Sequence, residues 1–279
     1  MDISPLELCL KDLRARDHDR YLTLPFVPEE VRATVTVLYA FNAEIARIRE
    51  TVSEPMLGEI RLQWWREGIE ALGDGELRQH PVLEAMAATK ESGIWEADTV
   101  MPLIDARARD LDEDPIETLE ALEDYAEATS SELMRLALKA CGATAPVDLV
   151  RHAGLAYALT GLLRAMPTHA SQGRILIPLE TMRETGLDPH SVLRGQTNDG
   201  LREAYDAMIA RIDMHLDVLR TRRREIAREA VPALMPVSLV PLYLRQLRDP
   251  AYHPFEDPTD VPAYRRQWRL LRSRRALKV

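Results

Sequence analysis

The sequence predicts an all-α protein, and three observations lead to this prediction. The chain has 279 residues but only 12 glycines and 3 phenylalanines, and it is rich in the helix-favouring residues alanine, leucine, arginine and glutamate. Apolar residues recur at three- and four-residue spacing, whereas no segment alternates apolar and polar residues as a half-buried strand does. Prolines fall where helices are expected to begin.

Prolines and glycines divide the first part of the chain into helices. Pro28 begins a strongly periodic segment with apolar residues at positions 31, 35, 38, 41, 45 and 48, the spacing of one helical face. The next helix is expected to begin at Pro55 and to end before Gly73–Gly75, since glycine accepts the left-handed conformation that ends helices. Two shorter helices are expected over 81–91 and 96–111.

The central region follows the same logic. Asp114 and Pro115 are residue types that suit a helix cap and a first turn, so a long helix is expected from there to Ala140. Pro146 begins the next helix. We expect Pro167 to end it, because proline lacks the N–H that a helix interior needs.

The last part of the chain is expected to hold helices over 178–184 and 198–228, the second capped by its first residue, an asparagine. Three prolines then divide a shorter apolar stretch that ends near residue 248. No repeat, low-complexity tract or linker precedes that point, so residues 1–250 are interpreted as one all-α domain. Residues 251–279 form a Pro-rich connector and a basic C-terminal helix.

The composition argues against several classes of protein. A net charge of −9 is unsuited to a general nucleic-acid binder. Two cysteines are too few for a disulfide framework and favour a reducing compartment. The sequence has no run of 18 apolar residues, so no transmembrane helix is expected. The N-terminus lacks the pattern of a signal peptide. We expect a cytoplasmic protein that can associate peripherally with the inner face of the membrane.

Residues 154–178 carry the frame of a known motif without most of its polar groups. The frame positions are Gly154, Ala156, Arg164, Gly173, Arg174 and Pro178. The segment resembles the second signature of the squalene/phytoene synthase family, G-x-A-x-Q-x-x-N-x-x-R-D-x-x-x-D-x-x-x-G-R-x-Y-x-P. In place of the family's Gln, Asn and two Asp, this chain has Ala158, Gly161, Ala165 and His169.

Residues 37–50 resemble the first aspartate-rich helix of the same family, Y-A-F-x-R-x-x-D-D-x-x-D. The matching positions are Tyr39, Ala40 and Phe41. At the three aspartate positions the chain has Ala46, Arg47 and Glu50. Carboxylates at such spacing share a helical face and hold Mg²⁺ against a diphosphate, and an arginine there repels a divalent cation. The resemblance thus implies that the metal ligands are lost.

Residues 52–66 indicate which branch of the family the chain resembles. They carry V-S-E followed by G-x-I-R-x-Q-W-W-R, as in a divergent branch of the family that includes a mitochondrial respiratory complex I assembly factor and its bacterial relatives. The family resemblance implies an isoprenoid-synthase-type helical bundle around a central cavity. The branch implies a non-catalytic protein with a binding or scaffold role in complex I biogenesis, and partners that include a respiratory-complex subunit.

Two other functions stay open. The first is a prenyltransferase that condenses two prenyl diphosphates, with Mg²⁺ on the unconventional ligands Glu44, Glu50 and Glu59. The second is a carrier of an apolar lipid or isoprenoid. No cofactor is expected unless the prenyltransferase alternative holds, and no histidine pair has the spacing of a zinc site.

Seven residues are candidates for cavity lining or anion binding, and none is assigned a catalytic role. They are Tyr39, Arg47, Glu50, Tyr125, Tyr157, Arg164 and Arg174. Guanidinium groups could hold a prenyl diphosphate or another apolar anionic lipid, but they could equally pair with carboxylates at the rim. The tyrosines could instead bond to the backbone. The cavity itself is expected to be apolar, with arginine at its mouth.

The C-terminal segment Ala263–Val279 holds seven basic residues and no acidic one. On a helix, Tyr264, Trp268 and Leu271 fall on one stripe. Such a segment suits the surface of an anionic membrane. The alternative is that it packs against the acidic segment 117–127 of its own chain.

Overall fold

The computed structural model describes residues 3–112, 114–257, 259 and 261–279, and this part of the chain contains helices and no strand. The all-α prediction is confirmed. The α-helices are α1 (Pro5–Arg16), α2 (His18–Thr23), α3 (Glu29–Ala46), α4 (Pro55–Asp74), α5 (Pro81–Ala88), α6 (Ala97–Ala106), α7 (Leu119–Ala126), α8 (Glu132–Ala140), α9 (Val147–Ser171), α10 (Leu179–Glu184), α11 (Pro189–Leu193), α12 (Asp199–Arg222), α13 (Val231–Leu234), α14 (Val240–Leu247) and α15 (Ala263–Ser273).

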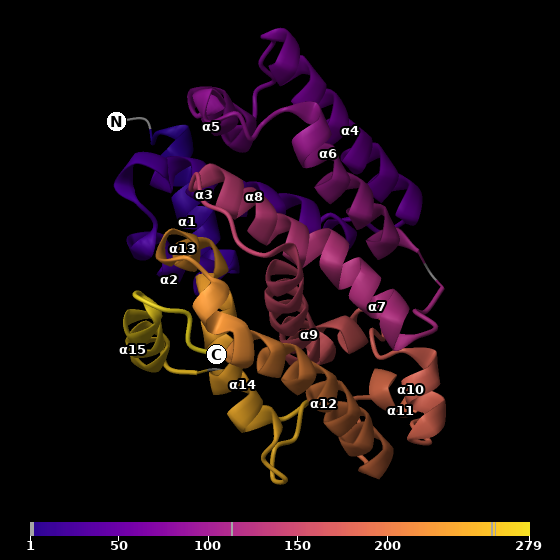
Figure 1. The fold of residues 1–279 in the computed structure, drawn as a ribbon. Coiled ribbons are helices and arrows are strands. Elements are labelled where there is room, and N and C mark those ends of the chain that lie inside the picture. Colours follow the sequence, from indigo (N-terminus) through magenta and orange to yellow (C-terminus); the bar gives the residue numbers. More distant parts are fainter. Residues whose placement is uncertain (1–2, 113, 258, 260) are drawn as a thin grey trace.

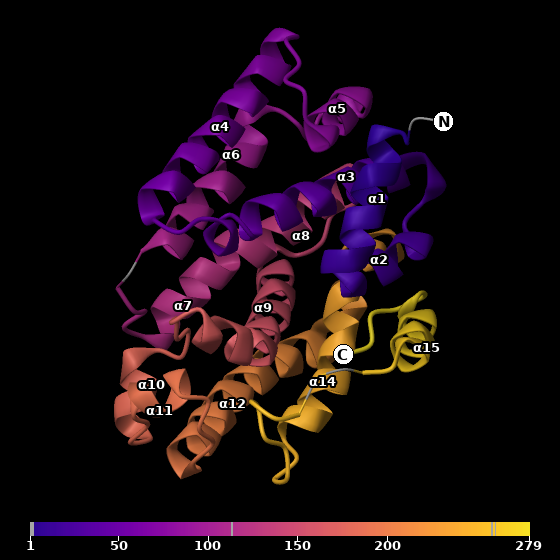
Figure 2. The same cartoon turned by 180° about the vertical axis from the view of Figure 1, so that it is seen from behind.

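Helix α9 runs through the middle of the bundle (Figure 1). It packs along α12 and against a π-helical turn, η5 (Glu127–Ser131), that joins α7 to α8. Helix α3 packs against α1 and α8. Figure 2 shows from behind that α4, α5 and α6 cover one end of the bundle, while α10, α11 and α12 lie at the other. Residues of the two signature segments line one cavity between α3 and α9.

One continuous apolar core connects these helices, and α3 and α9 supply much of it. The segment Arg228–Leu247 is long and apolar enough to cross a membrane, but 72% of its most apolar window is buried inside the protein. It is divided between α13, the 3₁₀ helix η8 (Met235–Leu239) and α14, whose prolines lie in the first turns. The apolar side chains of this segment therefore pack in the core of the protein.

The predicted helix start at Asp114–Pro115 is wrong. Helix α7 begins at Leu119, and its cap is Thr118, whose hydroxyl accepts the N–H of the third helical residue at 3.1 Å. The preceding residues are held outside the helix because the N–H of Leu179 donates to the carbonyl of Ile116 at 2.9 Å. This tertiary contact, which fixes the start of α10, overrides the local capping signal.

The prediction that Pro167 ends its helix is also wrong, since α9 continues to Ser171. A proline interior to a helix leaves the carbonyl four residues earlier without its usual donor. Here that carbonyl belongs to Leu163, and the buried hydroxyl of Tyr205 on α12 donates to it at 2.9 Å. The predicted cap at Asn198 is confirmed, although α12 ends at Arg222.

The C-terminal helix α15 lies beside η8 and α2 rather than beside the acidic segment 117–127. Leu270 and Leu277 are buried there. The guanidinium of Arg266 pairs with the buried carboxylate of Asp19 on α2 at 2.9 Å. The expectation that this segment packs against residues 117–127 is therefore wrong. The buried Leu270 and the ion pair of Arg266 place the helix against η8 and α2 instead.

Candidate functional site

A cavity of about 420 Å³ lies between α3 and α9, where the family resemblance places it. Its wall comes from the α1–α2 turn, the C-terminal end of α3, the middle of α9 and residues near α7. The lining residues are Arg16, Asp17, Arg20, Asn42, Ala43, Ala46, Arg47, Glu50, Arg107, Tyr125, Thr129, Ser130, Tyr157, Ala158, Gly161, Leu162 and Ala165. The predicted central cavity between the signature helices is confirmed.

Most of the positions that would hold metal carry small or basic residues. Ala46, Arg47 and Glu50 of the first signature line the same cavity as Gly161 and Ala165 of the second. Glu50 is the single carboxylate among them, whereas Mg²⁺ needs oxygen ligands in an octahedral set. Among the described residues, no three His, Cys, Asp or Glu side chains gather as metal ligands. The residues present do not fit the Mg²⁺ of a prenyltransferase.

The cavity lining contains four arginines but only two carboxylates, one aspartate and one glutamate. The most buried is Arg20, which pairs with Asp17 at 2.5 Å. Its guanidinium carbon lies 4.8 Å from the ring centre of Tyr157 and 5.6 Å from that of Tyr39, distances of cation–π contact. Burial raises the pKa of both tyrosines, so their hydroxyls stay protonated at neutral pH. The wall at this point is cationic and aromatic.

A polar cluster separates this cavity from a second one. Arg107 donates to the hydroxyl of Tyr125 at 2.9 Å, and that hydroxyl donates to Asp110 at 2.7 Å. The second cavity, of about 490 Å³, is lined by Tyr125, Asp110 and Arg174. The cluster thus forms a partition whose arginine belongs to one cavity and whose aspartate belongs to the other.

Four of the seven predicted site residues line the central cavity, namely Arg47, Glu50, Tyr125 and Tyr157. Arg47 also pairs with Glu44 at 3.2 Å, as the alternative interpretation required. Glu50 is exposed at the rim. The binding roles of these side chains stay predictions.

The other three lie elsewhere. Tyr39 is fully buried and is absent from the lining. Arg164 pairs with Asp19 at 3.2 Å and stacks on the ring of Tyr243 at 3.5 Å, so it joins α9 to α2 and α14 instead of facing the cavity. Arg174 lies in the second cavity, 3.7 Å from Asp110. Tyr39 and Arg164 were expected to line the cavity, but the structure places both side chains in structural contacts outside it.

Sequence reasoning missed three of the four cavity arginines. Arg16 and Arg20 precede the first signature in a short charged run, and Arg107 looks like a surface residue of the helix predicted over 96–111. The cavity is also less apolar than expected, because 11 of its 17 lining residues carry a polar side chain. The charged run R-x-R-D-H-D-R at 14–20 was the one available signal.

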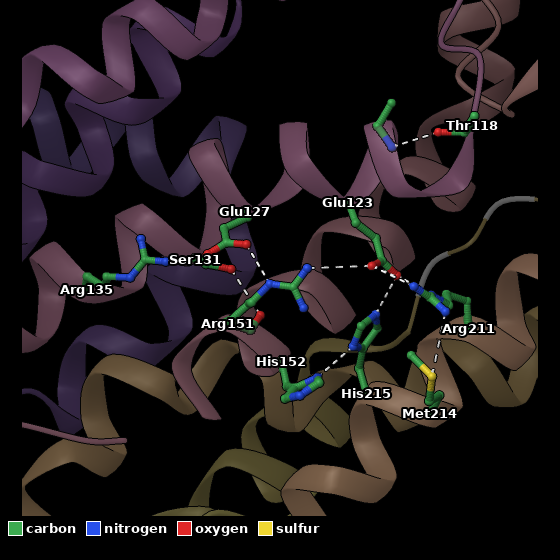
Figure 3. Close-up of polar contacts among 11 residues, drawn as sticks. Thr118, Glu123, Glu127, Ser131, Arg135, Arg151, His152, Arg211, Met214 and His215 are labelled. Carbon is green, nitrogen blue, oxygen red and sulfur yellow. Dashed lines mark hydrogen bonds and ion pairs between the residues drawn. The ribbon is translucent and has the colours of Figure 1, made fainter. Parts of the chain in front are cut away.

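A second polar cluster joins α9 to α7 and α12 (Figure 3). Glu123 is 2% exposed and accepts from His215 at 2.9 Å and from Arg211 at 2.9 Å. Burial opposes ionisation of Glu123, but these hydrogen bonds outweigh it and lower its pKa to about 2. Nδ1 of His215 lies 2.8 Å from Nδ1 of His152. The cluster is absent from the lining of both cavities, and we assign it a structural role.

This cluster predicts a loss of stability at acidic pH. Burial, and then the neighbouring His215 and Arg151, lower the pKa of His152 in the folded protein. A histidine whose pKa is lower in the folded than in the unfolded protein contributes stability at pH values above its unfolded-state pKa of about 6.5. This contribution is lost as the pH falls below that value. The free energy of unfolding should therefore fall as the pH drops below about 6.5, where the unfolded chain binds a proton that folded His152 does not. His152→Gln should flatten this dependence in urea titrations, and an unchanged slope would contradict the assignment.

Comparison with known proteins agrees with the fold. A dehydrosqualene synthase solved in complex with a ligand superposes with a TM-score of 0.79 at 17% identity, covering 96% of this chain and 94% of that one. A squalene synthase from Alicyclobacillus acidocaldarius gives a TM-score of 0.71 at 20% identity, covering 88% of this chain and 95% of that one. The bundle is therefore of the isoprenoid-synthase type, as predicted.

The squalene/phytoene synthase family model matches residues 13–275. The chain belongs to the squalene/phytoene synthase family. Its sequence is similar to complex I assembly factor 6 of Bos taurus, with 30% identity over 246 residues that cover 86% of this chain and 73% of that protein. It is also similar to a presqualene diphosphate synthase of Sinorhizobium fredii, with 25% identity, covering 77% of this chain and 78% of that protein. The predicted resemblance to the assembly-factor branch is confirmed.

Proposed function

We propose that this chain is a non-catalytic member of its family that acts in the biogenesis of respiratory complex I as a binding protein. Two kinds of support converge. Relatives named as complex I assembly factor 6 match 86% of the chain at up to 30% identity. A cavity lies between the two signature helices, and its lining departs from the signatures at the aspartate positions.

The replacement of metal ligands carries the proposal. Ionisation of an allylic diphosphate needs cations that stabilise the departing group. In this chain Ala46, Arg47 and Ala165 line the cavity at aspartate positions of the two signatures. Alanine offers no ligand atom, and the guanidinium of Arg47 repels a divalent cation. Binding without chemistry is the function that such a wall supports.

The prenyltransferase alternative required Glu44, Glu50 and Glu59 to gather around Mg²⁺. Glu44 is paired with Arg47, Glu59 is exposed on α4, and Glu50 alone lines the central cavity. The apolar-carrier alternative is also weakened, because Leu162 is the only large aliphatic side chain among the described residues of the lining. These placements favour the non-catalytic function.

The ligand class we favour for the cavity is a phosphate- or diphosphate-bearing molecule, including a prenyl diphosphate, held directly by arginine. Guanidinium groups bind such anions without metal. Two residues of the wall also have unused donors: the Nε of Arg107 and the hydroxyl of Ser130 are buried without a hydrogen-bond partner among the described residues. Buried polar atoms without a partner are uncommon in native proteins, and an anion seated here would satisfy them after small side-chain movements.

The proposed function is tested by deleting the gene in the organism that encodes it. The amount of assembled complex I should fall, measured as NADH:ubiquinone oxidoreductase activity of isolated membranes and as the intact complex on native gels. The wild-type chain and Glu50→Gln should both restore it, since no metal ligand is needed. Unchanged complex I after deletion would refute the proposal, and failure of a folded Glu50→Gln chain would favour the enzyme instead.

A further inference from the structure

The outer face of α15 exposes a stripe of large apolar side chains. Tyr264, Trp268 and Leu271 have exposed fractions of 66%, 62% and 43%, and their spacing of four and three residues places them on one helical face. The stripe is about 10 Å long at 1.5 Å per residue. Isolated apolar residues are common on surfaces, but a row with two aromatic rings marks an interaction site.

The orientation of this helix is fixed by contacts on its opposite side. Leu270 is fully buried, and Arg266 pairs with Asp19, which also accepts the hydroxyl of Tyr243 at 2.7 Å. Nε of Arg269 donates to the carbonyl of Ser238 at 2.9 Å. The stripe therefore points away from the protein because the other face of α15 is already engaged.

Among the residues that the structure describes, most basic side chains of this segment have no acidic partner. Of the seven, Arg266 alone forms an ion pair within the part of the chain that the structure describes. The other six are Arg265, Arg269, Arg272, Arg274, Arg275 and Lys278. Burial, and then the nearby cations of Arg272 and Arg220, lower the pKa of Arg269. A protein with net charge −9 thus concentrates unneutralised positive charge at one site.

Aromatic and basic groups meet in a groove between α14 and α15. The groove has a volume of about 310 Å³. It is lined by three apolar or aromatic side chains and three arginines, which are Leu242, Tyr264, Trp268, Arg265, Arg269 and Arg272. This combination suits a ligand with an anionic head and an apolar body.

We propose that α15 docks this protein on a bilayer of anionic phospholipids. Tyr264, Trp268 and Leu271 enter the boundary between headgroups and acyl chains, where amphipathic aromatic rings are favoured. Arg265 and Arg272 lie together along one side of the stripe, at the groove beside α14, and hold lipid phosphates there, in the manner of an interfacial helix. An anionic bilayer accounts for both features of α15, because its headgroups attract the arginines and its acyl boundary accepts the aromatic and leucine side chains. An acidic protein surface would account for the arginines alone.

Co-sedimentation of the full chain with vesicles tests the proposal. Binding is expected to vesicles of phosphatidylcholine with roughly 30% phosphatidylglycerol at low salt, to weaken as salt screens the charges, and to be much weaker with phosphatidylcholine alone. Arg265→Gln/Arg272→Gln should lower the partition coefficient about 30-fold, because each basic residue near such a surface contributes roughly fivefold. Trp268→Ala/Leu271→Ala should lower it at least about tenfold.

Two matched variants serve as controls. Arg183→Gln/Arg194→Gln removes the same charge from exposed positions on the α10–α11 side, far from α15 in both views. Met56→Ala/Ile60→Ala removes exposed apolar side chains from α4. Both should bind as the wild type does, and all variants should keep the wild-type melting curve. Binding that the α15 variants leave intact, or no binding to anionic vesicles at low salt, overturns the proposal. In the second case an acidic protein surface becomes the expected occupant.

Discussion

Replacing Gly154 with alanine is expected to destabilise the protein by about 3 kcal/mol, as severe overpacking does. Helix α9 approaches the π-helical turn η5 so closely here that an added Cβ would lie 2.5 Å from the backbone nitrogen of Ser131. The hydroxyl of Ser131 also donates to the carbonyl of Arg151 at 3.0 Å, which ties the two elements together. A backbone contact cannot move aside as a side chain can. Urea unfolding followed by circular dichroism measures the loss.

Gly161→Ala is the matched control on the same helix. No atom lies within 4 Å of the position that its Cβ would take, and alanine favours helix over glycine. The variant should be more stable than the wild type by about 0.4–1 kcal/mol. If the two substitutions had equal effects, the close approach at Gly154 would not be the reason for glycine there.

Returning carboxylates to the cavity should restore an affinity for Mg²⁺. In Ala46→Asp/Arg47→Asp/Ala165→Asp the three new carboxylates join Glu50 around one cavity. Calorimetry with Mg²⁺ and pyrophosphate should show metal binding at least roughly tenfold tighter than in the wild type, since oxygen ligands and phosphates complete the coordination of this ion. Ala46→Asp/Arg47→Asp, which leaves Ala165 unchanged, should gain less. Equal Mg²⁺ affinity of all three proteins would show that these positions do not face a common site.

The sequence predicted the fold well because the signature helices impose strong local patterns. Periodicity and capping indicated most helices, and the resemblance of the two signature segments to the family implied that their helices flank a central cavity. The errors at Pro115 and Pro167 share a cause. After Pro115, the carbonyl of Ile116 accepts a hydrogen bond from the N–H of Leu179 on α10. Before Pro167, the carbonyl of Leu163 accepts a hydrogen bond from the hydroxyl of Tyr205 on α12. No local sequence pattern encodes either contact.

The candidate site was less predictable than the fold. Positions inside the signatures, such as Arg47 and Tyr157, could be placed in the cavity from their register. Arg20 and Arg107 could not, because they reach it from other helices. Arg164 occupies a frame position of the second signature, yet its side chain pairs with Asp19 and does not line the cavity. Charge pairing between distant helices decides these orientations, and a single sequence does not reveal it.

The central claim is that this cavity binds without catalysing prenyl transfer. The direct test incubates the purified chain with farnesyl or geranylgeranyl diphosphate and Mg²⁺ and then extracts the products. Losing one group that stabilises a developing charge costs about 10²–10³ in rate, and here most of the metal ligands are replaced. We predict no squalene, phytoene or cyclopropyl intermediate above the level without protein. Formation of any of these products that requires Mg²⁺ and is abolished in Glu50→Gln would contradict the account.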